Sequence, residues 1–279
     1  VLGMSQILLL ILVIAVIISG ISASWISKKI VNPLNSINLD EPETSDVYEE
    51  LKPFTKRIAE ENFEKAQREE IRQQYTANVS HELKTPLTSI SGFAEILMNG
   101  GTDPKITVDF SKSIYDEAQR MTVLVNDIIK LSKLDEKSIA MEKEALSLRS
   151  ICREVMEVLS KSKNLSINLE GDSGLINGVE PVIYEMVYNL VDNAIKYNKA
   201  GGLVNINIQE LTNNVGDKNK VVLSVHDTGI GIPAVEKERI FERFYRIDKS
   251  RSRSLGGTGL GLGIVKHAAK YHNASILVT

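Results

Sequence analysis

The spacing of hydrophobic and polar residues changes twice along the chain, and these changes divide it into three regions. Residues 1–27 are almost wholly apolar and contain no charged side chain. Apolar residues then recur at steps of three and four up to about residue 136, which is the spacing of a stripe along one face of a helix. After Lys137 short alternating strands and helices follow. The pattern therefore predicts a membrane segment, a helical domain and an α/β domain.

The apolar start predicts a transmembrane helix over residues 1–27. It exceeds the ~20 residues that a helix needs to cross a bilayer. Trp25 near its end, followed by Lys28 and Lys29, is typical of an interfacial aromatic residue and a cytoplasmic boundary. A signal peptide or a buried core helix is disfavoured, because the segment is long and lacks a basic start. We expect a protein of the cell membrane whose remaining chain is cytoplasmic.

Residues 28–62 predict a cytoplasmic linker without a strong pattern. Residues 38–46 are acidic and contain a proline, which indicates a turn. Ser45 or Asp46 can cap a second helix, with an interruption at Pro53.

Residues 63–136 predict two helices joined by a short turn. The first ends near Gly100 and Gly101, since glycine supplies the left-handed cap. Asp103 caps the second, and Pro104 lies in its first turn. Two such helices form an antiparallel hairpin with more apolar surface than one pair can bury. Either a second copy or the next domain should cover it. The apolar stripes are Ile71, Tyr75, Val79, Leu83, Leu87 and Ile90 in the first helix, and Phe110, Ile114, Met121, Leu124, Ile128, Leu131 and Leu134 in the second.

The stretch from Ser80 to Leu87 carries the candidate chemistry of the first helix. His81 and Thr85 are four residues apart and share a face, and Glu82 is adjacent. A neutral imidazole beside a carboxylate on an exposed face is a nucleophile with its own base. Pro86 removes a backbone donor and should bend the helix. Taken alone, the stretch is better explained by a solvated His–Glu pair on the surface of the helix.

Residues 137–279 predict a two-layer α/β sandwich with a mixed sheet. The expected helices are 148–159, Pro181 to about Asn198, and 265–271; the expected strands are 165–169, 203–211, 221–226 and 276–279, with a polar turn at 213–219.

Four polar residues share one face of the helix that begins at Pro181, namely Glu185, Asn189, Asn193 and Tyr197. Amide and carboxylate oxygens are ligands suited to Mg²⁺. A polar solvent face is the alternative, although asparagine is a poor helix former for such positions.

Two glycine-containing segments complete the candidate nucleotide site. Asp227 ends a strand, and a buried carboxylate there can accept a hydrogen bond from an adenine amino group, while Gly229 and Gly231 allow close approach. Residues 256–263 are rich in glycine and open a helix, where free backbone donors form an anion site. Their spacing fits neither the Rossmann nor the Walker pattern.

A basic segment lies between these two glycine segments. A charge run is usually a solvated face, but one that bridges two halves of a phosphate site predicts a lid. Phe241, Phe244 and Tyr245 interleave with its cations, which are Lys237, Arg239, Arg243, Arg246, Lys249, Arg251 and Arg253.

Composition excludes some functions. The net charge of −3 gives no case for nucleic-acid binding, which needs a clustered positive surface. The single cysteine, Cys152, excludes an internal disulfide and falls in a helical apolar pattern, so we expect a small core residue.

Four motifs together resemble those of sensor histidine kinases. Ser80 to Leu87 (SHELKTPL) resembles the phosphoacceptor box, and three nucleotide-site boxes follow in order, at Asn189 to Tyr197, Asp227 to Pro233 and Gly257 to Leu262. The resemblance extends from about Phe63 to the C-terminus. One motif would be weak support, whereas four in the family's order are strong.

The resemblance implies a fold and a set of site residues. The hairpin would form a dimeric four-helix bundle (63–136), and residues 137–279 would adopt the ATPase fold of histidine kinases, type II topoisomerases and some chaperones. Residues 30–34 resemble the start of a relay coiled coil. The implied Mg²⁺ ligands are Asn193 and Asn189, with Glu185 a weaker candidate. The implied ATP contacts are Asn189, Asn193, Lys196, Tyr197, Asp227, Gly229, Gly231, Gly257, Thr258, Gly259, Leu260 and Gly261, with Arg246 or Arg243 at the γ-phosphate.

The resemblance also implies the reaction and its partners. ATP would phosphorylate His81 with Glu82 as the base, and the phosphoryl group would pass to an aspartate of a response regulator. Thr85 would hold water for dephosphorylation of that regulator. The rival hypotheses are an ATPase that phosphorylates no histidine and a non-catalytic membrane scaffold. Because the chain starts with Val and stops inside a strand-like segment, we expect a piece of a longer protein.

Overall fold

The computed structural model describes residues 3–31, 52–100, 103–135, 142–160, 165–211, 220–248 and 256–279. They divide into two units, residues 1–77 and 78–279, which we treat separately. Several predicted features lie outside the described residues: the linker 32–51 with Ser45 and Asp46, Gly101, the domain boundary at Lys137, the turn at 213–219, and the lid cations Lys249, Arg251 and Arg253.

The first unit contains the predicted apolar helix. α1 spans Met4–Ile26 and continues into a π-helical turn, η1 (Ser27–Val31). By length and composition Gln6–Lys29 is a candidate membrane span, and its aliphatic side chains are exposed. The Lys29 ammonium lies 4.8 Å from the centre of the Trp25 ring. This stretch is therefore long and apolar enough for a bilayer, as predicted.

α3 (Lys52–Met98) is one continuous helix that begins in the first unit and ends in the second. Pro53 lies in its first turn, where the missing N–H costs nothing. The interruption that was expected at Pro53 is therefore absent. In the first unit the charged face forms exposed pairs one turn apart, such as Arg68 with Glu64. α3 also continues through Pro86; the bend expected there stays a prediction.

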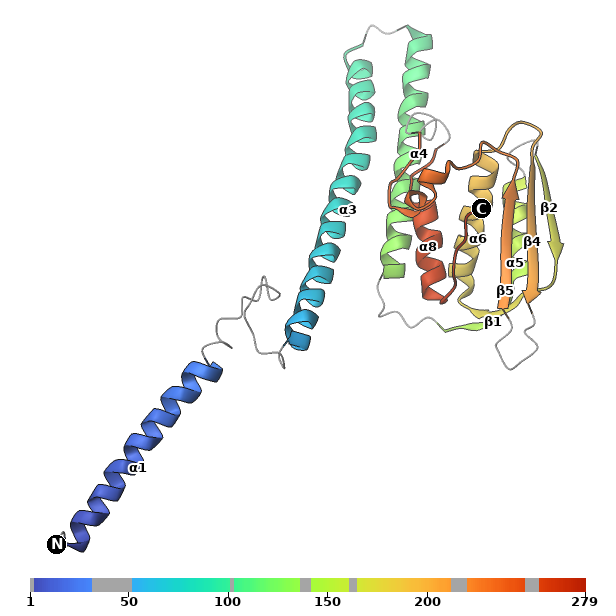
Figure 1. Cartoon of the computed structure of the whole chain (residues 1–279). Helices are drawn as coiled ribbons and strands as arrows, with labels where there is room; N and C mark the ends of the chain where they lie inside the picture. The colour runs from blue at the N-terminus through green and yellow to red at the C-terminus, as the bar shows by residue number, and fades with distance from the viewer. Residues whose placement is uncertain are drawn as a thin grey trace. The chain divides into compact units, whose positions relative to one another are not determined.

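The turn between α3 and α4 (Pro104–Asp135) follows the predicted rules. Gly100 has a left-handed φ of 71°, and Asp103 Oδ1 accepts a hydrogen bond of 2.7 Å from the Lys105 amide. The two helices run in opposite directions from this turn (Figure 1). Near the turn, the Phe93 and Phe110 rings pack with their centres 5.0 Å apart. The second unit therefore begins with the expected helical hairpin.

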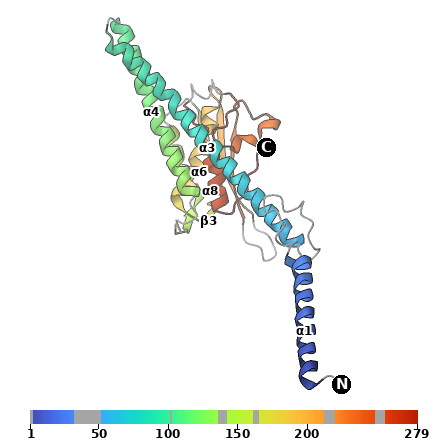
Figure 2. The same cartoon turned by 90° about the vertical axis from the view of Figure 1, so that its left-hand side faces the viewer.

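The α/β domain is built on a mixed sheet in the order β2–β4–β5. β2 (Ser166–Gly171) is parallel to β4 (Leu203–Leu211), and β4 is antiparallel to β5 (Lys220–Asp227). α5 (Leu148–Leu159) and α6 (Glu180–Lys196) pack on the sheet (Figure 1). α8 (Gly261–Tyr271) packs on α6 and on α4 (Figure 2). The predicted two-layer α/β sandwich with a mixed sheet is confirmed.

Alternation in β4 builds the core of this domain. Val204, Ile206 and Ile208 point to the helices and are fully buried with Val187 and Val191 of α6. Cys152 of α5 is buried in the same cluster, and burial raises the pKa of its thiol to about 11. It is therefore a core residue, as expected, rather than a reactive thiol.

The prediction was wrong for three short segments. β1 (Glu144–Ser147) and β3 (Leu175–Gly178) pair as a separate antiparallel sheet that the pattern did not indicate. Residues 276–279, expected to begin a strand, are not in a strand. A strand exists only where a neighbour completes its ladder, and an apolar run of four residues does not supply one. Two short η helices, Ala234–Glu236 and Arg239–Phe241, lie in the lid.

Candidate functional site

The His81 side chain is exposed on α3, and Glu82 and Thr85 lie within about one turn of it. The Thr85 hydroxyl donates to the His81 carbonyl oxygen at 3.1 Å. Glu82 is half-buried and faces the α/β domain, where it meets Arg246. Pro86, which is buried, leaves the Glu82 carbonyl without its usual i+4 donor. The structure thus places an accessible imidazole beside a carboxylate that accepts a hydrogen bond from Arg246.

The asparagine face of α6 lies against the start of α8. Asn189 Nδ2 donates to the Glu185 carbonyl at 2.8 Å. A Cβ at Gly261, the first residue of α8, would lie only 2.6 Å from Asn189 Oδ1. A side chain at this position would therefore require the Asn189 amide to move. Amide oxygens beside a helix N-terminus are a donor set that fits Mg²⁺ together with phosphate oxygens.

The end of α6 packs on the turn that follows β5. Lys196 pairs with Asp192 at 2.6 Å. The Tyr197 carbonyl oxygen accepts a hydrogen bond from the Ile230 amide at 3.3 Å, and a Cβ at Gly229 would lie 2.4 Å from that oxygen. The sequence analysis identified Gly229 as a close-approach glycine, and the atom that it approaches is the Tyr197 carbonyl.

Asp227 differs from expectation. Its side chain is exposed rather than buried, because it ends β5 at the edge of the sheet. Asp227 Oδ1 accepts from the Gly229 amide at 2.8 Å and so holds the turn in shape. Gly231 has a left-handed φ of 69°, which favours glycine at that position. A contact between Asp227 and adenine stays a prediction.

The glycine-rich segment is joined directly to the lid. The Phe244 amide donates to the Gly259 carbonyl at 2.8 Å, and both residues have left-handed φ angles, 65° and 74°. A Cβ at Gly259 would lie 2.9 Å from the Phe244 Cα. Gly257 and Leu260 flank this contact, and the hydroxyl of buried Thr258 accepts from the Leu260 amide at 3.3 Å. The segment leads into α8, as predicted.

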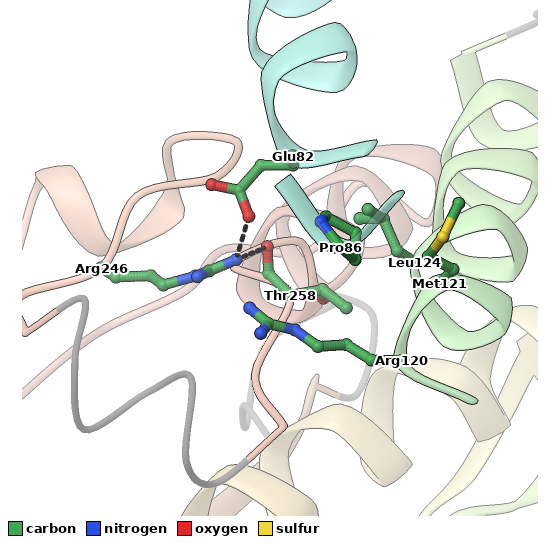
Figure 3. A pocket seen from close by; sticks show the side chains of 7 residues that line it. All are labelled: Glu82, Pro86, Arg120, Met121, Leu124, Arg246 and Thr258. Carbon is green, nitrogen blue, oxygen red and sulfur yellow. Dashed lines mark hydrogen bonds and ion pairs between the residues drawn. The ribbon is translucent and has the colours of Figure 1, made fainter. Parts of the chain in front are cut away.

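The two candidate lid arginines have different partners. Arg243 Nη2 lies 3.0 Å from His267 Nε2 on α8. Arg246 Nη2 donates to Glu82 Oε2 at 3.0 Å and to the Thr258 carbonyl at 2.9 Å (Figure 3). The Arg246 side chain is only 5% exposed, and its Nε has no partner among the described residues. Of the two, Arg246 is the one that reaches the helix that carries His81.

Two residues of α4 contact the candidate nucleotide site, and the sequence analysis missed both. The Thr258 hydroxyl donates to Asp127 Oδ2 at 2.7 Å, and Lys130 Nζ lies 2.7 Å from Glu185 Oε1. Burial raises the pKa of Asp127, and the hydrogen bond from Thr258 partly opposes that increase. The only available signal was that both residues are polar and flank the apolar stripe of α4.

A small cavity lies where α3, α4 and the lid meet (Figure 3). Its volume of about 10 Å³ is roughly that of one water probe, so it is too small for a nucleotide. Its lining comes from all three elements: Glu82, Pro86, Arg120, Met121, Leu124, Arg246 and Thr258. Among the described residues no cluster of three His, Cys, Asp or Glu side chains gathers at a metal-binding distance.

Two protein families match the chain. Residues 71–137 match the His Kinase A (phospho-acceptor) domain, and residues 178–279 match the family of histidine kinase-, DNA gyrase B- and HSP90-like ATPases. These matches cover the hairpin with His81 and the part of the α/β domain that holds the nucleotide-site residues. They define the class as a chain with a phosphoacceptor domain and an ATPase domain of the histidine kinase type.

The similar curated proteins are sensor kinases. The chain is 38% identical over 217 residues to the sensor-like histidine kinase SenX3 of Mycolicibacterium smegmatis, covering 76% of this chain and 55% of SenX3. It is 36% identical over 211 residues to the sensor histidine kinase WalK of Bacillus subtilis, covering 74% of this chain and 34% of WalK. The chain thus spans between a third and about half of the length of these relatives.

A solved structure agrees with these matches. Histidine kinase ThkA in complex with response regulator protein TrrA superposes with a TM-score of 0.54 at 27% identity, covering 72% of this chain and 57% of that one. The chain is therefore a homologue of the sensor histidine kinases, and it carries both of their characteristic domains.

Proposed function

We propose that the chain is the kinase portion of a membrane-bound sensor that phosphorylates itself on His81 with ATP. The observation that carries the proposal is the contact between Glu82, next to the exposed His81, and Arg246 of the ATPase domain at 3.0 Å. Both halves of a phosphoryl transfer, the acceptor helix and the lid of the nucleotide site, meet there. The family matches and the sensor kinase relatives support this function.

The proposed reaction is an in-line transfer. An imidazole nitrogen of His81 forms a bond to the γ-phosphorus, the bond to the ADP oxygen breaks, and Glu82 takes the imidazole proton. Lys196, a lid arginine and the backbone donors before α8 would offset the charge on the phosphates. Asn193 and Asn189 would bind Mg²⁺, which would offset phosphate charge. Positioning and electrostatic stabilisation supply most of the catalysis in such transfers.

Glu185 is the weaker metal ligand. One of its carboxylate oxygens is paired with Lys130 in this structure, which leaves fewer acceptor positions for a metal or its water. Tyr197, the residue after α6, holds the adjoining turn through its carbonyl, and its side chain would contact the nucleotide.

We propose a homodimer and a response regulator as the partners. Exposed apolar side chains remain on the hairpin, including Leu87, Ile96, Val108, Val123 and Ile129, and a second copy would cover them. ThkA was solved with the response regulator TrrA, which supports a receiver-domain aspartate as the phosphoryl acceptor. Thr85 would orient water for the reverse dephosphorylation of that regulator.

We also propose that α1 crosses the cell membrane, with Lys28 and Lys29 on the cytoplasmic side. Its length, its exposed aliphatic surface and the basic residues at one end support this topology.

The test is to label the full chain with γ-labelled ATP and Mg²⁺, beside the variants His81→Gln and Asn193→Ala. Acid-labile, base-stable label that is absent from both variants establishes the histidine kinase. If the wild type hydrolyses ATP without taking label, the chain is an ATPase that phosphorylates no histidine. If the wild type neither hydrolyses ATP nor takes label, the result supports the non-catalytic membrane scaffold.

A further inference from the structure

β2 lies at the edge of the mixed sheet, and in the part of the chain that the structure describes it pairs only with β4. The amides of Ser166 and Asp172 donate to carbonyls on the β4 side, at 3.3 Å and 2.8 Å. Alternate residues of a strand bond to the same neighbour, so the N–H and C=O groups of Ile167 and Leu169 point away from β4. An unpaired row of this kind is a template for another strand.

β2 lacks the usual protection of an edge strand. Such strands are commonly blunted by several charged side chains, a proline or a bulge. β2 has a single charged residue, Glu170, and no proline, and its register with β4 runs without a bulge. Ser166 and Asn168 are exposed and neutral. Arg149 donates to the Gly171 carbonyl, so the open part of the edge ends at Glu170.

A groove beside this edge leaves room for a neighbouring molecule. α5 contacts both β2 and β4, so it is set back from the edge. The open space between α5 and β2 measures about 370 Å³. Two packed helices need about 8–10 Å between their axes, which a set-back helix can provide on both sides of a paired edge. The groove has half-buried apolar residues at its base and exposed polar residues on its wall, namely Met156, Leu165 and Ile167, and Arg153, Glu157 and Ser160.

The charges on the wall of the groove favour a second copy of this chain as the occupant. Arg153 and Glu157 are one turn apart on α5 and carry opposite charges. A two-fold dimer uses the same surface on both molecules, and its two α5 helices would run antiparallel. Arg153 of one copy would then face Glu157 of the other. A segment of one charge would be attracted by one of these residues and repelled by the other.

We propose that β2 is a self-association edge, at which a second copy adds its own β2 as an antiparallel strand. Pairing centred on Asn168 uses the whole open edge: Ile167 and Leu169 of the two copies exchange both main-chain hydrogen bonds, and Ser166 lies opposite Glu170. Pairing centred on Glu170 would oppose two like charges. β2 lies on the side of the domain away from α4 (Figure 1), so the hairpin can pair at the same time and the chain can assemble beyond a dimer.

The first experiment is disulfide crosslinking of the full chain in detergent micelles, which does not depend on kinase activity. In the proposed pairing the two Asn168 Cα atoms lie about 4.5 Å apart, within reach of a disulfide. Asn168→Cys should therefore give a covalent dimer on mild oxidation. The unchanged chain sets the baseline, because its single cysteine, Cys152, is buried.

Gln209→Cys is the matched control for random collision. Gln209 is exposed on the same face of the sheet as Asn168, but it lies on β4. Two such residues would be separated by three strand spacings, roughly 14 Å, which no disulfide can bridge. The control should stay at the baseline.

The second experiment measures the rate of crosslinking when the charge opposite Glu170 is changed. Added to Asn168→Cys, Ser166→Glu should slow crosslinking about fivefold and Ser166→Lys should speed it about fivefold, because two such cross-strand pairs form in the symmetric dimer. Combining Ser166→Glu with Glu170→Lys should restore the rate. Sedimentation of the charge variants without the added cysteine gives the same comparison if Asn168→Cys does not fold.

Two results would overturn the proposal. One is a covalent dimer from Asn168→Cys that does not exceed that from Gln209→Cys, in which case the edge is left for an extended segment of another protein. The other is a rate, or a sedimentation, that is the same in Ser166→Glu and Ser166→Lys, since residue 166 would then not face Glu170 of a second copy. Neither result bears on the labelling of His81, so the kinase function is tested separately.

Discussion

The α/β domain and the helical hairpin bury their apolar residues in opposite ways. In the α/β domain Val187, Val191 and Ile206 are completely buried within the chain. In the hairpin Leu87 is 54% exposed and Val108 is 66% exposed. Apolar area removed from water stabilises a fold, and exposed apolar patches mark interaction sites. The first domain thus completes its core alone, whereas the second presents a surface that needs a partner.

The largest effect is expected from a substitution inside the complete core. Ile206→Ala should lower the free energy of unfolding of the α/β domain by about 2–5 kcal/mol, because it removes transfer energy and leaves a cavity. Chemical denaturation followed by circular dichroism measures the loss. Leu211→Ala, at the exposed end of the same strand, should cost within about 0.5 kcal/mol. Equal losses for the two variants would show that β4 is not packed as described.

The next effect concerns the exposed surface of the hairpin. Leu87→Glu should weaken self-association about tenfold or more, since dimerisation would bury an unpaired charge. Sedimentation of the full chain in detergent measures the dimer dissociation constant. Lys84→Glu, one turn earlier and also exposed, is the matched control for added negative charge. A dimer as strong as the wild type with Leu87→Glu would place Leu87 outside the interface.

A smaller effect on the free energy of unfolding is expected from protonation of His272, which links Val179, just before α6, to Ala268 of α8. His272 Nε2 accepts from the Val179 amide at 3.0 Å, and Nδ1 donates to the Ala268 carbonyl at 2.9 Å. The bond from Val179 requires an unprotonated Nε2, and burial lowers the pKa of His272 below its ordinary value of 6.5. The unfolded chain then binds the proton more readily, so stability is full above 6.5 and decreases as the pH falls below it.

Denaturation of the full chain at a series of pH values tests this expectation. The free energy of unfolding of the wild type should fall between about pH 7 and pH 5, and the fall should be shallower in His272→Gln. An identical pH dependence in both proteins would contradict the assigned role of the imidazole.

The local features of the fold were predictable, because short-range chemistry sets them. The helix 148–159 was predicted with the bounds that the structure has, and Asp103 and Gly100 act at the hairpin turn as their residue types require. β1 and β3 were missed because each has four residues, which is too few for an alternating pattern. Their pairing depends on tertiary contacts alone.

The same division applies to the candidate site. The glycine positions followed from the motif, and the close approach of Gly261 to Asn189 explains one of them. The partner of Thr258 could not be predicted, since Asp127 is 131 residues away and the contact exists only because α4 docks on α8. The exposure of Asp227 was also missed, because it depends on β5 being the edge strand.

The smallest effect is expected from Thr85→Ala, which tests the surface of the hairpin next to His81. The Thr85 hydroxyl only donates to a carbonyl of its own helix, so its loss should change stability little and leave the rate of His81 labelling within about twofold. Dephosphorylation of a phosphorylated response regulator should slow, because the proposed water loses its partner. Thr88→Ala removes the same kind of bond, from Thr88 to the Lys84 carbonyl, and should leave both rates unchanged. Loss of kinase and phosphatase activity together in Thr85→Ala would refute this division of roles on the exposed face, and the hydroxyl would then be needed to shape the helix around His81.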